Sequence, residues 1–75
     1  MKELVEFIAK AIVNAPDQVE VTEETTEQGI TLKLKVADDD KGRVIGKQGR
    51  IAEAMRTLIR VKAAKTGTRA TLEIV

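Results

Sequence analysis

Residues 41–51 of the chain read Lys41-Gly42-Arg43-Val44-Ile45-Gly46-Lys47-Gln48-Gly49-Arg50-Ile51. Two glycines three positions apart, Gly46 and Gly49, interrupt a stretch that otherwise reads as helical. Glycine admits backbone conformations and close approaches that a side chain obstructs, so this spacing predicts a tight, exposed turn between two helices. The turn also places the N-terminus of the second helix, a natural site for phosphate, beside Lys47 and Arg50.

Both segments that flank this turn are predicted to be helical. Asp38, Asp39 and Asp40 are typical N-cap residues and precede a short helix over residues 41–45. A long helix is predicted over residues 49–66, ending at Gly67. Its apolar stripe is expected at Ile51, Ala54, Met55, Leu58 and Ile59, with Lys62 extending along the stripe to reach solvent.

An N-terminal helix is predicted over residues 2–14. Its apolar positions follow the helical period at Leu4, Phe7, Ile8, Ala11 and Ile12, with Val5 beside them. Phe7 is the single aromatic residue of the chain, and its place in this stripe predicts that it lies in the core. Asn14 and Pro16 end the helix, because proline cannot continue it.

Three strands are predicted, over residues 18–25, 30–36 and 69–75. Ile30, Leu32, Leu34 and Val36 alternate with polar residues, and Gln28-Gly29 supplies the turn of a hairpin. The next strand follows two helices, and such a crossover favours parallel pairing. We therefore expect an α+β fold of order α-β-β-α-α-β, with a three-stranded mixed sheet and three helices on one face.

Length and charge set further limits. The chain has 75 residues, which predicts a single domain over 1–75. Its net charge is only +1, but residues 1–40 carry four basic and ten acidic side chains, whereas residues 41–69 carry nine basic and one acidic. This separation indicates a segment that binds a polyanion, although solvated helix faces also carry Lys and Arg.

Several kinds of chemistry are excluded by composition. The chain has no His and no Cys, so the usual transition-metal ligands and nucleophile–base pairs are missing, and we predict neither an enzyme nor a cofactor. Asp38, Asp39 and Asp40 lack the spacing of a calcium loop, so no metal site is expected. No signal-peptide or membrane-spanning pattern is present, which favours a cytoplasmic protein with no membrane partner.

Two other interpretations of the glycine pair compete with a phosphate-binding turn. A nucleotide-binding P-loop is rejected, because Gly42 to Gly46 is one residue short and Gln48 stands where Ser or Thr is needed. The second alternative, an ordinary corner between two helices that needs two glycines, stays open on spacing alone.

The stretch from Val44 to Ile51 resembles the signature of KH domains, whose Gly-x-x-Gly loop joins two helices and clamps about four nucleotides of single-stranded nucleic acid. The element order resembles the type II, prokaryotic version. The similarity covers the whole chain, and this layout is that of the small stand-alone bacterial KH proteins of the KhpA-like family. Residues 70–75 are also similar to the end of proteins in that family.

This resemblance implies single-stranded RNA binding without catalysis, in RNA chaperoning or post-transcriptional control, with a link to cell shape. It implies a homodimer, or a heterodimer with a larger KH-containing bacterial protein. An alternative function is docking to another KH protein or the ribosome with little RNA binding. The residues implied to contact RNA, as loop or as groove lining, are Arg43, Val44, Ile45, Gly46, Lys47, Gln48, Gly49, Arg50 and Ile51.

Basic residues outside the loop are assigned mainly to solvent. Lys33 and Lys35 are interpreted as the solvent face of a strand, and Arg56 and Arg60 as a solvated helix face in which Glu53 pairs with Arg56. Because no aromatic residue is free to stack on bases, aliphatic contacts and hydrogen bonds must hold them, which predicts weak binding with loose sequence preference.

Overall fold

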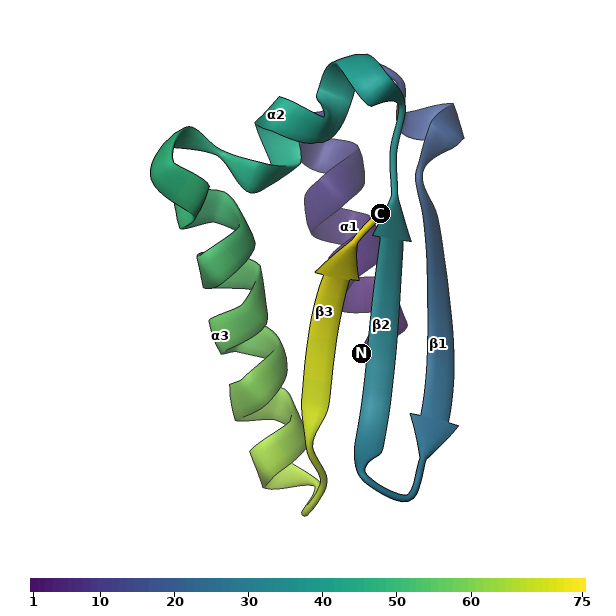
Figure 1. Ribbon diagram of the computed structural model, residues 1–75, viewed down its shortest axis with the longest axis vertical. Helices are drawn as coiled ribbons and strands as arrows, with labels where there is room; N and C mark the ends of the chain where they lie inside the picture. Colours follow the sequence, from purple (N-terminus) through teal and green to yellow (C-terminus); the bar gives the residue numbers. More distant parts are fainter.

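A computed structural model describes residues 1–75, and its elements follow the predicted order (Figure 1). The helices are α1 (Lys2–Ile12), α2 (Lys41–Ile45) and α3 (Arg50–Lys65), and the strands are β1 (Glu20–Thr26), β2 (Gly29–Lys35) and β3 (Ala70–Ile74). Short 3₁₀ turns cover Pro16–Gln18, Asp38–Asp40 and Lys47–Gly49. The predicted α+β class and element order are confirmed.

The three strands form one mixed sheet in the order β1-β2-β3. β1 and β2 form the antiparallel hairpin, with Val21 opposite Leu34. β2 and β3 are parallel, with Leu32 opposite Leu72, which confirms the expected crossover. At the end of the sheet where β2 and β3 begin, the N–H of Ile30 donates to the carbonyl oxygen of Arg69 at 2.8 Å. This hydrogen bond joins the hairpin to the start of β3.

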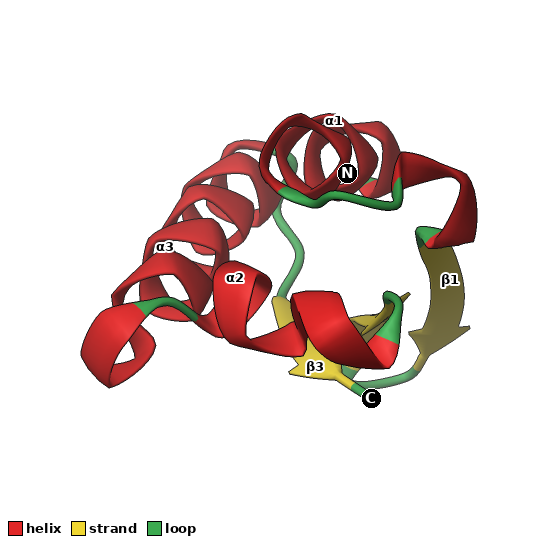
Figure 2. Cartoon of the chain, turned by 90° about the horizontal axis from the view of Figure 1, so that it is seen from above, coloured by secondary structure: helices red, strands yellow, loops and turns green.

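The helices lie on one side of this sheet (Figure 2). α1 and α3 lie against its face, and α2 crosses its upper end and joins β2 to α3 (Figures 1 and 2). The opposite face is open, and there Lys33 pairs with Glu24 at 3.6 Å, while Lys35 is exposed. Lys33 and Lys35 therefore lie on the solvent face of β2, as predicted.

Alternation along β2 places its apolar side chains beneath the helices. Leu32, Leu34 and Val36 are buried, as predicted, and Ile30 is half-buried. They belong to one apolar cluster with buried residues from every helix and strand: Val5, Ala9, Val21, Val44, Met55, Ile59, Ala63, Ala70 and Leu72.

The predicted orientation of α1 is partly wrong. Within the predicted stripe Phe7 is 75% exposed and Ala11 is also exposed, whereas Val5 and Ala9 are fully buried. Apolar residues occupy eight of the ten positions from 4 to 13, so they surround most of the helix, and periodicity does not single out one face. The smaller Val5 and Ala9 let the helix lie close to the sheet. α1 also ends at Ile12, two residues early, because Val13 is extended.

The predicted stripe of α3 is also partly wrong. Ala52, Met55, Ile59 and Ala63 are buried, while Leu58 is 48% exposed and Ala54 lies at the surface. Two small alanines in the buried stripe allow the helix to approach β3, and this turns Leu58 outward. Lys62 is exposed and does not lie in the buried stripe.

Candidate nucleic-acid interface

The loop between α2 and α3 has the conformation that its glycines permit. Gly46 and Gly49 have φ values of 76° and 74°, in the left-handed region that favours glycine. The N–H of Gly46 donates to the carbonyl oxygen of Gly42 at 2.9 Å, which ends α2. The N–H of Gly49 donates to the carbonyl oxygen of Gly46 at 3.1 Å. Four residues are therefore enough to end α2, turn the chain and begin α3.

Gly46 is also required by close packing. A Cβ at this position would lie 2.6 Å from Cγ1 of Ile51, far inside van der Waals contact. Nothing lies within 4 Å of a Cβ at Gly49, where only the backbone conformation demands glycine. The two glycines thus have different functions: Gly46 lets the loop rest on Ile51, and Gly49 leaves open space at the start of α3.

Gln48 is the only residue other than glycine with positive φ, at 59°. Such a conformation costs a side-chain-bearing residue roughly 1–2 kcal/mol and is concentrated at binding sites. Its Oε1 accepts a hydrogen bond from Arg50 at 3.3 Å, which places the guanidinium beside the loop. Lys47 forms no ion pair within the chain, and its side chain is exposed.

Asp40 has a role that its place before α2 does not predict. Its carboxylate is 1% exposed and does not cap α2. It accepts the backbone N–H groups of Asn14 at 3.1 Å and Ala15 at 3.0 Å, in the connection after α1. Its Oδ1 also lies 3.6 Å from Nε of Arg43. Asp40 thus fastens the start of α2 to the end of α1 and holds Arg43.

The predicted apolar lining divides between core and surface. Val44 is fully buried in the core, so it supports α2 from below and offers no surface to a ligand. Ile45 is 40% exposed and Ile51 is half-buried, and both lie next to the loop in sequence. Only these two of the three predicted apolar positions are accessible.

Two arginines of α3 share one acidic partner, Glu53. Arg56 lies 3.7 Å from Glu53, as predicted, and its Nε also donates to the carbonyl oxygen of Leu72 at 3.4 Å. Arg60 reaches the same carboxylate at 4.0 Å. Arg56 therefore links α3 to the edge of β3, which the sequence did not predict because the two residues lie far apart along the chain.

Asp38 is exposed and pairs with Lys41 at 3.4 Å, and no group of three or more metal-ligating side chains is present. None of the helices combines the length and apolarity that a bilayer span requires.

Comparison with known proteins places this geometry in a family. The chain matches the KH domain of KhpA and KhpB over residues 2–74. It is 56% identical to the RNA-binding protein KhpA of Clostridium acetobutylicum and 55% identical to that of Caldanaerobacter subterraneus subsp. tengcongensis, each over the full length of both chains. It is 47% identical to the RNA-binding protein KhpA of Listeria monocytogenes, over 100% of this chain and 99% of that protein.

No solved structure matches the chain significantly. The fold, the Gly-x-x-Gly loop between two helices and the full-length similarity agree, and the chain belongs to the KhpA/KhpB family of KH domains.

Proposed function

We propose that the chain binds single-stranded RNA, with the loop from Gly46 to Gly49 holding the sugar-phosphate backbone. The observation that carries the proposal is the open loop at the start of α3, where two glycines in the left-handed region lie beside exposed Lys47 and Arg50. Backbone N–H groups and the positive end of the helix dipole attract phosphate there. The relatives' name, RNA-binding protein KhpA, supports the choice of RNA.

Each predicted contact residue has a distinct function in this proposal. Lys47 and Arg50 attract phosphate, and Gly49 leaves room for the backbone to approach. Ile45 and Ile51 offer aliphatic surface to bases. Arg43, kept beside Asp40, adds charge one helical turn before the loop. Without an aromatic platform the affinity for a short strand is low and its sequence preference loose.

The proposed activity is non-catalytic. The chain, as one KH unit over residues 1–75, acts in the cytoplasm as an RNA chaperone or post-transcriptional regulator. Weak binding to about four nucleotides suits transient contact with many RNAs.

A partner chain forms part of the proposal. Phe7 of α1 and Leu58 and Val61 of α3 are 75%, 48% and 52% exposed, on two helices that cover the same face of the sheet (Figure 2). Large apolar side chains exposed on a surface are typical of interaction sites. We propose that these helices pair with a second copy or with a larger KH-containing protein, which raises avidity for RNA.

The test is an RNA titration at two salt concentrations with the double variant Lys47→Asp plus Gln48→Asp. Both side chains are exposed, so the variant stays folded, and the added negative charge repels phosphate. The affinity should fall by at least about tenfold, and wild-type binding should weaken steeply with salt.

A matched control makes the same charge change away from the loop. Lys10→Asp plus Gln18→Asp alters two exposed residues outside the loop, one in α1 and one in the turn before β1, and should retain most of the affinity. If both double variants bind like the wild type, the loop is only a corner between helices. If no protein binds RNA, the docking alternative replaces the proposal, and its apolar interface should be insensitive to salt.

A further inference from the structure

A hollow of about 340 Å³ lies between α3 and β3, far from the glycine loop. Its floor contains small alanines, Ala63 and Ala64, and its rim carries Arg60, Arg69 and the hydroxyls of Thr68 and Thr71. The small alanine side chains let a ligand strand approach closely. The arginine and threonine side chains can then contact the charged side of that strand.

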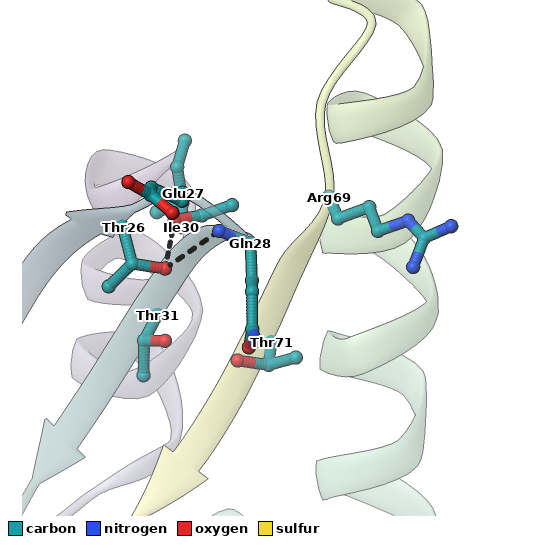
Figure 3. A pocket seen from close by; sticks show the side chains of 8 residues that line it. Thr26, Glu27, Gln28, Ile30, Thr31, Arg69 and Thr71 are labelled. Carbon is teal, nitrogen blue, oxygen red and sulfur yellow. Dashed lines mark hydrogen bonds between the residues drawn. The ribbon is translucent and has the colours of Figure 1, made fainter.

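The two arginines stand on different walls of this hollow. Arg60 belongs to α3, and Arg69 directly precedes β3. Figure 3 shows the Arg69 side chain leaving the strand toward the pale green helix α3, away from the hairpin residues Gln28 and Thr26. A second hollow of about 560 Å³ adjoins the first through Arg69 and Thr71 and continues to Gln28.

These arginines are weakly neutralised within the chain. Arg69 has no ion pair, and Arg60 reaches only the exposed carboxylate of Glu53, at 4.0 Å. Glu27, at the far side of the second hollow, is the only acidic residue that lines either one. The charge of Arg69 is therefore unpaired within the chain, and the charge of Arg60 is countered only by the exposed carboxylate of Glu53.

The hollow is aligned with the loop along α3. Arg50 and Arg60 are ten residues apart on the same helix, which is about 15 Å along its axis. Between them Arg56 donates to the carbonyl oxygen of Leu72, so α3 lies against the edge of β3 at this level. A strand that leaves the loop along α3 passes Arg56 and then meets Arg60 and Arg69.

We propose that this hollow is a second phosphate site for the same RNA strand, beyond the nucleotides held at the loop. The inference rests on the proposed RNA binding. Guanidinium groups bind phosphate oxygens through paired N–H donors, so one phosphodiester fits between Arg60 and Arg69. Thr68 and Thr71 supply hydroxyls that hydrogen-bond to the sugar or phosphate. The ligand is a stretch of single-stranded RNA longer than about four nucleotides.

The test measures affinity against RNA length. Oligouridines of about 4, 8 and 12 nucleotides, bracketing the KH site, are titrated into the wild type and into Arg60→Gln plus Arg69→Gln. The control, Lys10→Gln plus Lys62→Gln, makes the same charge change at two exposed lysines without ion pairs, one of them about 200° around α3 from Arg60. Circular dichroism confirms that each variant is folded.

The wild type and the control should bind the longer oligomers on the order of tenfold more tightly than the shortest one. The salt dependence should be steeper by about 0.7 in log–log slope, for one more phosphate contact. The arginine variant should keep the affinity for the shortest oligomer and lose the steeper salt dependence. It should retain only the smaller gain in affinity that a longer strand provides by offering more binding registers. In the wild type, the Nε–H NMR signals of Arg60 and Arg69 should shift with long RNA only.

Two results would overturn the inference while leaving the loop proposal intact: equal wild-type affinity for all lengths, or the same length gain in the arginine variant. Loss of the length gain in the lysine control would also overturn it, because general charge would then explain the effect. Failure of the wild type to bind any oligomer would instead reject the proposed function, and this inference with it.

Discussion

The carboxylate of Asp40 accepts the backbone N–H of Asn14 at 3.1 Å, across 26 residues of sequence. The contact joins the end of α1 to the start of α2, the helix that leads into the glycine loop. Because the same carboxylate also holds Arg43, one buried side chain fixes the orientation of the loop relative to the rest of the fold.

Asp40→Ala should lower the free energy of unfolding by about 2–4 kcal/mol, because two N–H groups lose their acceptor in a part-buried site. Urea denaturation measures the effect. The neighbouring Asp39 is exposed, and its carboxylate accepts no hydrogen bond within the chain. Asp39→Ala therefore serves as a control that removes the same charge and no hydrogen bond. Equal losses in the two variants would contradict the assigned role of Asp40.

Gly46→Ala should destabilise the protein more than Gly49→Ala. Gly49→Ala places a side chain in the left-handed helical region, which costs roughly 1–2 kcal/mol. Gly46 has φ 76° and ψ 172°, a region essentially limited to glycine, so the backbone alone makes Gly46→Ala cost about 1–3 kcal/mol. Only Gly46→Ala also drives a Cβ into Ile51, which adds about 1–3 kcal/mol of overpacking. Thermal or urea unfolding compares the two. Adding Ile51→Ala should restore part of the free energy of unfolding that Gly46→Ala loses. It should restore none of the free energy that Gly49→Ala loses, since only Gly46 contacts the Ile51 side chain.

Phe7→Ala should change the free energy of unfolding by less than about 1 kcal/mol, although Phe7 is the largest apolar side chain of α1. It is 75% exposed and buries little surface. Ile59→Ala, at a side chain that is 1% exposed, should cost about 2–5 kcal/mol. Dilute protein, at which any paired form dissociates, is needed for the measurement. A large loss at Phe7 under those conditions would place it in the core after all.

Phe7→Ser plus Leu58→Ser should leave the fold intact and abolish pairing. The two side chains expose apolar area on neighbouring helices, and removing it takes away the driving force for association. Sedimentation velocity over a range of concentrations gives the fraction of paired chains. Thr22→Ala plus Thr71→Ala, exposed changes on the open sheet face, should leave that fraction unchanged. A wild type that is monomeric at every concentration would reject the proposed pairing.

The sequence predicted the topology and the loop well, because both depend on short-range patterns. Alternation in β2 and the two-helix crossover were sufficient to predict a parallel β3. Gly46 and Gly49 predicted the turn because the left-handed region excludes most other residues. These signals are local, and the tertiary structure did not override them.

Helix orientation was predicted less well, because apolar residues surround most of α1 and part of α3. Periodicity alone did not distinguish Val5 from Phe7, or Ala52 from Leu58, since each pair is apolar. Packing against the sheet buries the smaller residue of each pair and leaves the larger one exposed. The partners of Asp40 and Arg56 were also out of reach, because Asn14 and Leu72 are distant in sequence and carry no pattern that indicates the contact.

The parallel pairing of β2 with β3 has a consequence for how the protein is made. The glycine loop lies inside the crossover between these strands, and α3 rests on β3 through Ala70 and Leu72, which are buried. A ribosome synthesises the N-terminal part first, at about 5–20 residues per second, so α1, β1 and β2 emerge several seconds before β3. The crossover that carries the loop is therefore packed on a complete sheet only after residue 74 has left the exit tunnel.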